Sequence, residues 1–157
     1  MSRAQLRTNW GALIASRHED PVALYEMAIA DLGHAIDLNP QSGELWIRRG
    51  QARVNLGIWI ASTRQDPVKH YRAAIADYLE AIQRNANGDE ALLSLANARG
   101  QLWIWLDHEG DAESETQLAE LRAAADRDVA TINEHRAQGH AQVDADAASA
   151  ISARHAS

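Results

Sequence analysis

The chain of 157 residues contains no cysteine and no phenylalanine, and it has only three prolines. Without cysteine there is no disulfide, no thiol nucleophile and no zinc site built on cysteine. No run of about 18 apolar residues occurs, and the start, MSRAQLRTNW, lacks the apolar stretch of a signal peptide. We therefore expect a cytoplasmic protein with no membrane partner. The formal net charge of −7 argues against nucleic acid as a partner.

The motifs of common enzymes and metal sites are also missing. There is no GxSxG motif, no P-loop and no glycine-rich dinucleotide motif. His135 and His140 are spaced so that they do not share one helix face, and Asp144 and Asp146 lack the other ligands of a calcium loop. We expect no enzyme, no metal and no cofactor. A small-molecule or metal regulator is a remote alternative that only the seven histidines support.

The residues that are present favour helices. Alanine dominates the apolar residues, and five tryptophans supply most of the large aromatic surface. Alanine has the highest helix propensity of all residues. No segment alternates apolar and polar residues in the manner of a half-buried strand. The composition therefore predicts an all-α fold without a sheet.

A repeat with a period of 46 residues runs through the chain. The two most similar copies, identical at 16 of 30 positions, are RTNWGALIASRHEDPVALYEMAIADLGHAI from Arg7 and RVNLGIWIASTRQDPVKHYRAAIADYLEAI from Arg53. A third copy begins around Arg99, and its second half, RAAADRDVATI from Arg122, aligns with RAAIADYLEAI from Arg72 only after four extra residues. Such a repeat indicates stacked helical units, the last of which has diverged as a terminal cap.

Each repeat contains the pattern of two helices, and in the first two repeats the second helix opens with Asp-Pro-Val. Asp20 and Asp66 suit the free amides of a first turn, and Pro21 and Pro67 already have a helical φ. Apolar residues then recur at steps of three and four and form one face. The pattern predicts helices at residues 2–16, 21–38, 43–63, 67–84, 89–107 and 112–135.

The last part of the chain has a different composition. Residues 136–157 are rich in alanine, serine and glycine and contain few large apolar side chains. We expect a repeat domain at residues 1–135, followed by a tail at 136–157 that is either a frayed helix or disordered.

The second helix, the turn and the next first helix resemble tetratricopeptide repeats. The runs are YEMAIADLGHAIDLNPQSGELW from Tyr25 and YRAAIADYLEAIQRNANGDEALL from Tyr71. The positions that match the family pattern best are Pro40, Trp46, Gly50, Ala74, Tyr78 and Ala81. Arg49 and Arg53 depart from it, because the family has leucine and tyrosine there.

The repeat is also longer than the family's typical length of about 34 residues, so longer helices are expected. This long form resembles the repeats appended to bacterial serine/threonine kinases of the eukaryotic type, although nothing kinase-like occurs in this chain. The resemblance implies a right-handed α-solenoid of about three antiparallel helix pairs. It also implies a non-catalytic adaptor or scaffold that binds a protein or peptide.

In this family the first helices of successive pairs line a concave groove that receives the partner. The resemblance places these partner-binding candidates in the groove: Arg48, Gln51, Asn55, Glu90, Ser94, Asn97 and Gln101. Beside them it places Gln5, Thr8, Asn9, Glu44, Ile47 and Leu93. Arg48 suits a carboxylate in fork geometry. Ile47 and Leu93 stand where family members that clamp a C-terminal carboxylate need a basic residue, so that activity is not expected.

Three tryptophans form a second candidate surface near the ends of the first helices. Trp59, Trp103 and Trp105 would make an aromatic patch typical of interfaces if they were exposed together. The alternative is that at least two of them fill the core that the longer helices create. A different functional alternative is self-assembly through the repeat ends into a homo-oligomer.

Overall fold

The computed structural model describes the backbone of residues 2–84, 88–109 and 114–155, and within these ranges all side chains except those of 109, 114–115, 136 and 139–155. The helices are α1 (Arg3–Ser16), α2 (Val22–Leu38), α3 (Gly43–Ser62), α4 (Val68–Gln83), α5 (Gly88–Glu109) and α6 (Ser114–His155). No strand occurs in these ranges, which confirms the predicted all-α class. In the same ranges, no helix is long and apolar enough to cross a membrane.

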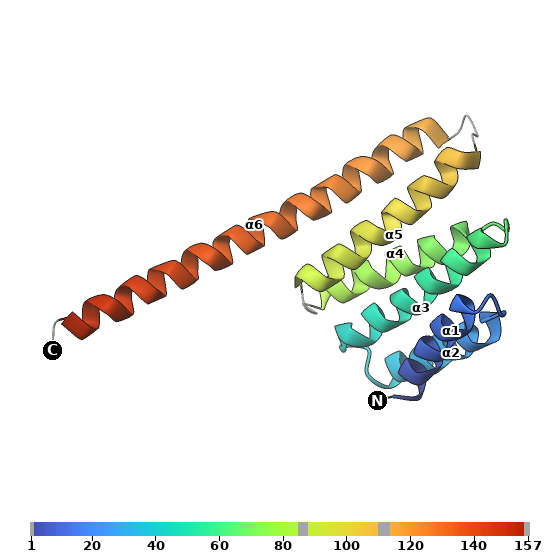
Figure 1. Ribbon diagram of the computed structural model, residues 1–157, viewed down its shortest axis with the longest axis horizontal. Coiled ribbons are helices and arrows are strands. Elements are labelled where there is room, and N and C mark those ends of the chain that lie inside the picture. Colours follow the sequence, from blue (N-terminus) through green and yellow to red (C-terminus); the bar gives the residue numbers. More distant parts are fainter. Residues whose placement is uncertain (1, 85–87, 110–113, 156–157) are drawn as a thin grey trace.

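The six helices pack sequentially in adjacent antiparallel pairs. Each pair consists of a first and a second helix, namely α1 with α2, α3 with α4, and α5 with α6. The pairs are joined because α2 also packs on α3, and α4 packs on α5. The first helices contact one another as well, α1 with α3 and α3 with α5. Figure 1 shows the helices in this order along the molecule.

The start of each second helix has the predicted chemistry in the first two repeats. Asp20 Oδ1 accepts a hydrogen bond from the Val22 amide at 2.9 Å, and Asp66 Oδ1 accepts one from the Val68 amide at 2.8 Å. The proline between each aspartate and valine has a right-handed helical conformation. The Asp-Pro-Val segments therefore open α2 and α4, with the first helical residue at the valine.

The last helix is longer than expected. The pattern predicted a helix that ends near residue 135, but α6 continues to His155. This segment has no proline and is rich in alanine, which favours helix without tertiary contacts. Figure 1 shows α6 running beside α5 and then projecting beyond the other helices. Whether the chain divides at residue 135 into a domain and a tail stays a prediction.

An arginine of the first helix bonds to an aspartate of the second helix in every pair. The bonded residues are Arg7 with Asp31, Arg53 with Asp77, and Arg99 with Asp128. The arginines recur at the period of the repeat. The last aspartate lies one position beyond the residue that the alignment paired with Asp77, so α6 is slightly shifted relative to the other second helices.

Asp77 is the most buried of these aspartates, with a side chain that is 2% exposed. Its carboxylate accepts hydrogen bonds from Arg49 Nη2 at 2.7 Å and from Arg53 Nη1 at 2.6 Å. Burial lowers the pKa of Arg53, and the negative charge of Asp77 opposes that effect. The two arginines that depart from the family pattern therefore neutralise one buried carboxylate.

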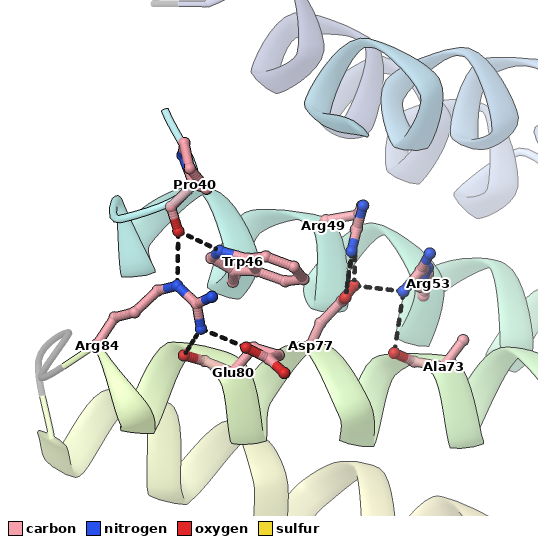
Figure 2. Close-up of polar contacts among 8 residues, drawn as sticks. All are labelled: Pro40, Trp46, Arg49, Arg53, Ala73, Asp77, Glu80 and Arg84. Atoms are coloured by element: carbon pink, nitrogen blue, oxygen red, sulfur yellow. Dashed lines mark hydrogen bonds and ion pairs between the residues drawn. The ribbon is translucent and has the colours of Figure 1, made fainter. Parts of the chain in front are cut away.

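Trp46 and Arg84 attach the turn between α2 and α3 to the end of α4. The Trp46 indole N–H donates a hydrogen bond to the Pro40 carbonyl at 3.1 Å, and Arg84 Nε donates one to the same oxygen at 2.6 Å. The guanidinium carbons of Arg49 and Arg84 each lie 4.8 Å from the centroid of the Trp46 ring, within the range of cation–π attraction. Figure 2 shows these contacts beside the Asp77 cluster.

Glycines on the first helices admit tyrosine rings from the second helices. A Cβ atom would lie 2.8 Å from the Tyr25 ring at Gly11, 2.6 Å from the Tyr71 ring at Gly57, and 2.7 Å from the Tyr78 ring at Gly50. The third repeat has Trp103 in place of Gly57 and Leu121 in place of Tyr71. Glycine thus faces a tyrosine ring in the first two repeats, as close packing requires, whereas the third repeat has two large residues at these positions.

Replacing Asp77 with alanine is expected to destabilise the fold by about 3 kcal/mol, because two largely buried arginines lose their counter-ion. Asp31→Ala is the matched control, since Asp31 and Arg7 are 27% and 29% exposed and water can replace the lost partner; a loss of about 1 kcal/mol or less is expected there. Urea denaturation measures both free energies. Equal losses would show that the burial of Asp77 has no energetic consequence.

Replacing Gly57 with alanine is expected to destabilise the fold by roughly 1–3 kcal/mol, because the new methyl group overlaps the Tyr71 ring. Gly100 is the control, since a Cβ atom there meets nothing within 4 Å. Gly100→Ala should stabilise the fold by roughly 0.5–1 kcal/mol through helix propensity. Thermal and urea unfolding of the two variants should therefore shift in opposite directions, and a shift in the same direction would refute the packing argument.

Candidate functional site

A cavity of about 250 Å³ opens where the first helices lie next to one another. Its lining residues come from α1, α3 and α5, with one contribution from α2: Gln5, Thr8, Leu32, Glu44, Ile47, Arg48, Gln51, Glu90 and Ser94. We call this cavity the groove cavity. All of these residues except Leu32 are positions that the family resemblance placed in the groove. The structure therefore brings them together around one cavity.

Arg48 is the centre of a polar network that links α1 to α3 across the groove cavity. Its Nε and Nη2 atoms both donate to Glu44 Oε1, and its Nη1 atom donates to Gln5 Oε1 at 2.7 Å. Gln5 Nε2 in turn donates to Asn9 Oδ1 at 2.9 Å. The guanidinium keeps further N–H groups beyond these bonds, because it carries five donors in total. A ligand carboxylate that takes the side-on fork formed by Nε and Nη2 must displace Glu44.

The wall formed by α3 continues with a pair of side-chain amides. Gln51 Nε2 donates to Asn55 Oδ1 at 3.0 Å, one helical turn further along. Each amide keeps one donating and one accepting group free to match a peptide backbone. On α5, the Ser94 hydroxyl bonds to Tyr78, whose pKa is raised mainly by burial. The groove cavity thus combines polar walls with the buried side chain of Ile47.

The remaining groove candidates lie at other places on the first helices. Leu93 and Asn97 are exposed on α5 and do not line the groove cavity. Asn55 and Gln101 line two different cavities, one repeat apart, nearer the ends of α3 and α5. The predicted set therefore divides between the groove cavity and these two further cavities.

The two further cavities are copies of one another at the repeat period, and we call them the tandem pockets. The first, of about 350 Å³, is lined by Ala12, Ala15, His18, Tyr25, Asn55, Ile58, Trp59 and Ser62. The second, of about 430 Å³, is lined by Ala61, Arg64, Tyr71, Gln101, Ile104, Trp105 and His108. Seven of the eight positions in the first pocket correspond, 46 residues later, to the seven positions of the second. Ala15 corresponds to Ala61, for example, and Ser62 corresponds to His108. Each pocket has a tryptophan, a tyrosine and an isoleucine, with an amide and a basic side chain.

In each tandem pocket, the basic residue just after the first helix has an unusual backbone conformation. His18 has φ of 61° and Arg64 has φ of 59°, in the left-handed region that favours glycine. In both places the following residue donates its amide to the carbonyl five positions earlier, Glu19 to Ile14 and Gln65 to Ile60, which caps the first helix. Both first helices therefore end with a non-glycine residue in the left-handed conformation.

The three candidate tryptophans do not line a common cavity. Trp59 and Trp105 belong to the two tandem pockets, and all three side chains are partly buried. Trp103 lines a separate cavity of about 260 Å³ with Leu121 and other residues of α5 and α6. A larger opening of about 640 Å³ lies between α4, α5 and α6 and also has Leu121 in its wall. These cavities mark looser packing where leucine stands in place of Tyr71.

Within the described residues, no group of three or more histidine, cysteine, aspartate or glutamate side chains is placed to hold a metal ion. The side chains of His140, Asp144 and Asp146 lie outside the described residues. His135 Nδ1 lies 3.0 Å from Asp89 Oδ1, a contact that joins α6 to the start of α5. Among the histidines, only those of the tandem pockets belong to a cavity described above, namely His18 and His108.

No family model matches the chain, and no curated protein or solved structure is significantly similar to it. The class that the fold defines is a six-helix all-α protein whose helices pack sequentially in adjacent pairs. Function belongs to sites and not to folds, so it has to be argued from the side chains of the groove cavity and the tandem pockets.

Sequence reasoning missed the tandem pockets, although part of the signal was present. Gly11 with Tyr25 and Gly57 with Tyr71 recur at the repeat period, which places each tyrosine beside a first helix. The left-handed conformation at position 64 had no signal, because neither glycine nor asparagine stands there.

Replacing Arg64 with glycine is expected to stabilise the fold by roughly 0.5–1 kcal/mol, because glycine adopts the left-handed conformation without a Cβ penalty. Arg64→Ala is the control, since it removes the same charge but keeps the Cβ atom. The free energy of unfolding in urea compares the two. If glycine gave no gain over alanine, the backbone at this position would carry no strain.

Proposed function

We propose that the protein is a non-catalytic binding module of the tetratricopeptide kind, a right-handed α-solenoid of three helix pairs that holds a peptide or protein segment. The observation that carries this proposal is that side chains from three first helices, far apart in sequence, line one groove cavity. These side chains are mostly polar, exposed or half-buried, and suited to hydrogen bonding. A surface of this composition fits a peptide backbone better than a purely apolar ligand.

The amides of the groove supply the backbone recognition in this proposal. Gln51 and Asn55 bond to each other on α3, and Asn97 is exposed on α5. Each has a donor and an acceptor on one planar group, which matches the N–H and C=O of an extended peptide. Arg48 adds a positive charge, which favours a partner with an acidic side chain near this point.

The tandem pockets supply side-chain recognition. Trp59 and Trp105 give each pocket a large aromatic wall, and tryptophan is among the residues that most often dominate binding energy. Neighbouring helices are about 10 Å apart, a distance that about three residues of an extended chain span at 3.3 Å per residue. The partner expected here therefore presents two apolar side chains about three positions apart. Because His18 and Arg64 line the pockets, acidic residues beside those side chains are favoured.

A displayed library of random peptides tests the proposal without knowledge of the natural partner. The immobilised protein is expected to select peptides that share two apolar positions and an acidic residue. A groove variant with Arg48, Gln51, Asn55, Asn97 and Gln101 all changed to alanine should bind the selected peptides at least about tenfold more weakly, the equivalent of losing one or two net hydrogen bonds.

The matched control carries Lys69→Ala and Gln83→Ala, which lie exposed on α4 away from the groove cavity. It should bind the selected peptides as the unaltered protein does. Helical circular dichroism of the groove variant must stay unchanged for the comparison to hold. Equal binding by the groove variant and the control would reject the groove as the binding surface.

A further inference from the structure

The outer face of α1 carries large apolar side chains that no part of the described chain covers. Leu6, Trp10 and Leu13 are 55%, 61% and 51% exposed. They follow one another at steps of four and three, so they form a single stripe along the helix. Gln5 and Thr8, which line the groove cavity, lie on a different face of α1. The stripe is therefore a surface separate from the proposed binding groove.

The repeat shows what normally covers this stripe. Ala52 and Leu56 are the equivalents of Leu6 and Trp10 on α3, and they are 0% and 1% exposed. On α5 the equivalents Ala98 and Leu102 are 0% and 2% exposed. α3 is preceded by α2 and α5 by α4, and each packs on that preceding helix. The stripe on α1 thus corresponds to a surface that is covered by another helix in the later pairs.

Charge at the ends of the stripe restricts which helix fits. Arg3 and Arg17 continue the same spacing on either side of the apolar residues, and both are exposed. The sequence from 3 to 17 contains no acidic residue. If two copies met symmetrically through their α1 helices, these arginines would face arginines of the other copy, and like charges oppose that contact. A helix with acidic ends and small central residues is the complementary partner.

The exposed ridge of α6 has this pattern. It consists of Glu120, Ala123, Arg127, Ala130 and Glu134, all exposed. Glu120 and Glu134 are fourteen positions apart, as are Arg3 and Arg17, so both pairs of charges are separated by about 21 Å along a helix. None of these four charged residues forms an ion pair within the described part of the chain.

We propose that α1 of one copy binds the exposed ridge of α6 of a second copy, head to tail and antiparallel. In this arrangement Glu120 pairs with Arg17, and Glu134 pairs with Arg3. The two alanines of the ridge leave room for Leu13 and Leu6, and Arg127 lies over the Trp10 ring, a cation–π arrangement. The antiparallel direction is the one that neighbouring helices already have within the chain.

The proposed contact joins two different surfaces, so it leaves one of each free and can repeat. Association should therefore continue with rising concentration and not stop at a dimer. Two helices that meet along fourteen residues bury less than the roughly 800 Å² per partner of a standard interface, so the contact is expected to be weak and sensitive to salt. Each added copy would add one more groove cavity to the row of associated molecules.

Sedimentation equilibrium of the full chain over a wide concentration range tests the proposal, with two variants that block one surface each. Trp10→Glu blocks the stripe, and the double variant Glu120→Arg with Glu134→Arg blocks the ridge. The unaltered protein should show open-ended growth, while each variant alone should be a monomer. An equal mixture of the two variants should form a one-to-one complex, because one intact stripe and one intact ridge remain.

A variant with exchanged charges distinguishes loss of the contact from misfolding of the chain. The chain that carries Arg3→Glu, Arg17→Glu, Glu120→Arg and Glu134→Arg together should regain the association that the ridge variant loses. A monomeric unaltered protein at every concentration would overturn the proposal. So would a closed dimer that persists in the ridge variant, or an equal mixture that stays monomeric. Peptide binding by the Trp10→Glu variant, measured separately, shows that the groove is independent of this contact.

Discussion

In each helix pair, an arginine of the first helix bonds to an aspartate of the second helix, and this contact forms in only one relative position of the two helices. Asp77 shows this most clearly, since its side chain is 2% exposed and bonds to both Arg49 and Arg53. A buried ion pair adds little stability over apolar packing, but leaving one charge unpaired costs several kcal/mol. We therefore interpret the arginine–aspartate pairs as the feature that fixes the register of each helix pair. The tyrosine rings against Gly11, Gly50 and Gly57 then fix how closely the helices approach.

A fixed register within each pair explains how the candidate site arises. The ion pairs and tyrosine rings lie between the two helices of a pair, which leaves the opposite faces of α1, α3 and α5 to meet one another. Because the pairs repeat with little change, Trp59 and Trp105 occupy equivalent places, and so do Asn55 and Gln101. The groove cavity and the tandem pockets are thus consequences of repetition. In the proposed function, the ligand of this surface is an extended chain segment, whose backbone groups also recur at a regular spacing.

Much of the fold and part of the site could be predicted from the sequence. The repeat period and the Asp-Pro-Val segments located the helices, and the register placed Gln5, Arg48 and Gln51 on one surface. The role of Arg49 and Arg53 could not be predicted, because their partner Asp77 lies on another helix and its burial depends on packing. The length of α6 was left open between a frayed helix and a disordered tail, because an alanine-rich segment has the same composition whether it is helical or not. The exposure of Trp10 depends on which helices pack beside α1, and sequence patterns do not report neighbours in space.

The most direct test of a binding groove follows the NMR signals of individual side chains while a library-selected peptide is added. The side-chain amides of Gln51, Asn55 and Gln101 and the indole N–H groups of Trp59 and Trp105 are the relevant reporters. A peptide held in the groove should shift all of these signals to a common saturation point, and the Trp46 indole, bonded to the Pro40 carbonyl, should stay unchanged. Saturating binding that shifts Trp10 and leaves the groove amides in place would contradict the proposed function.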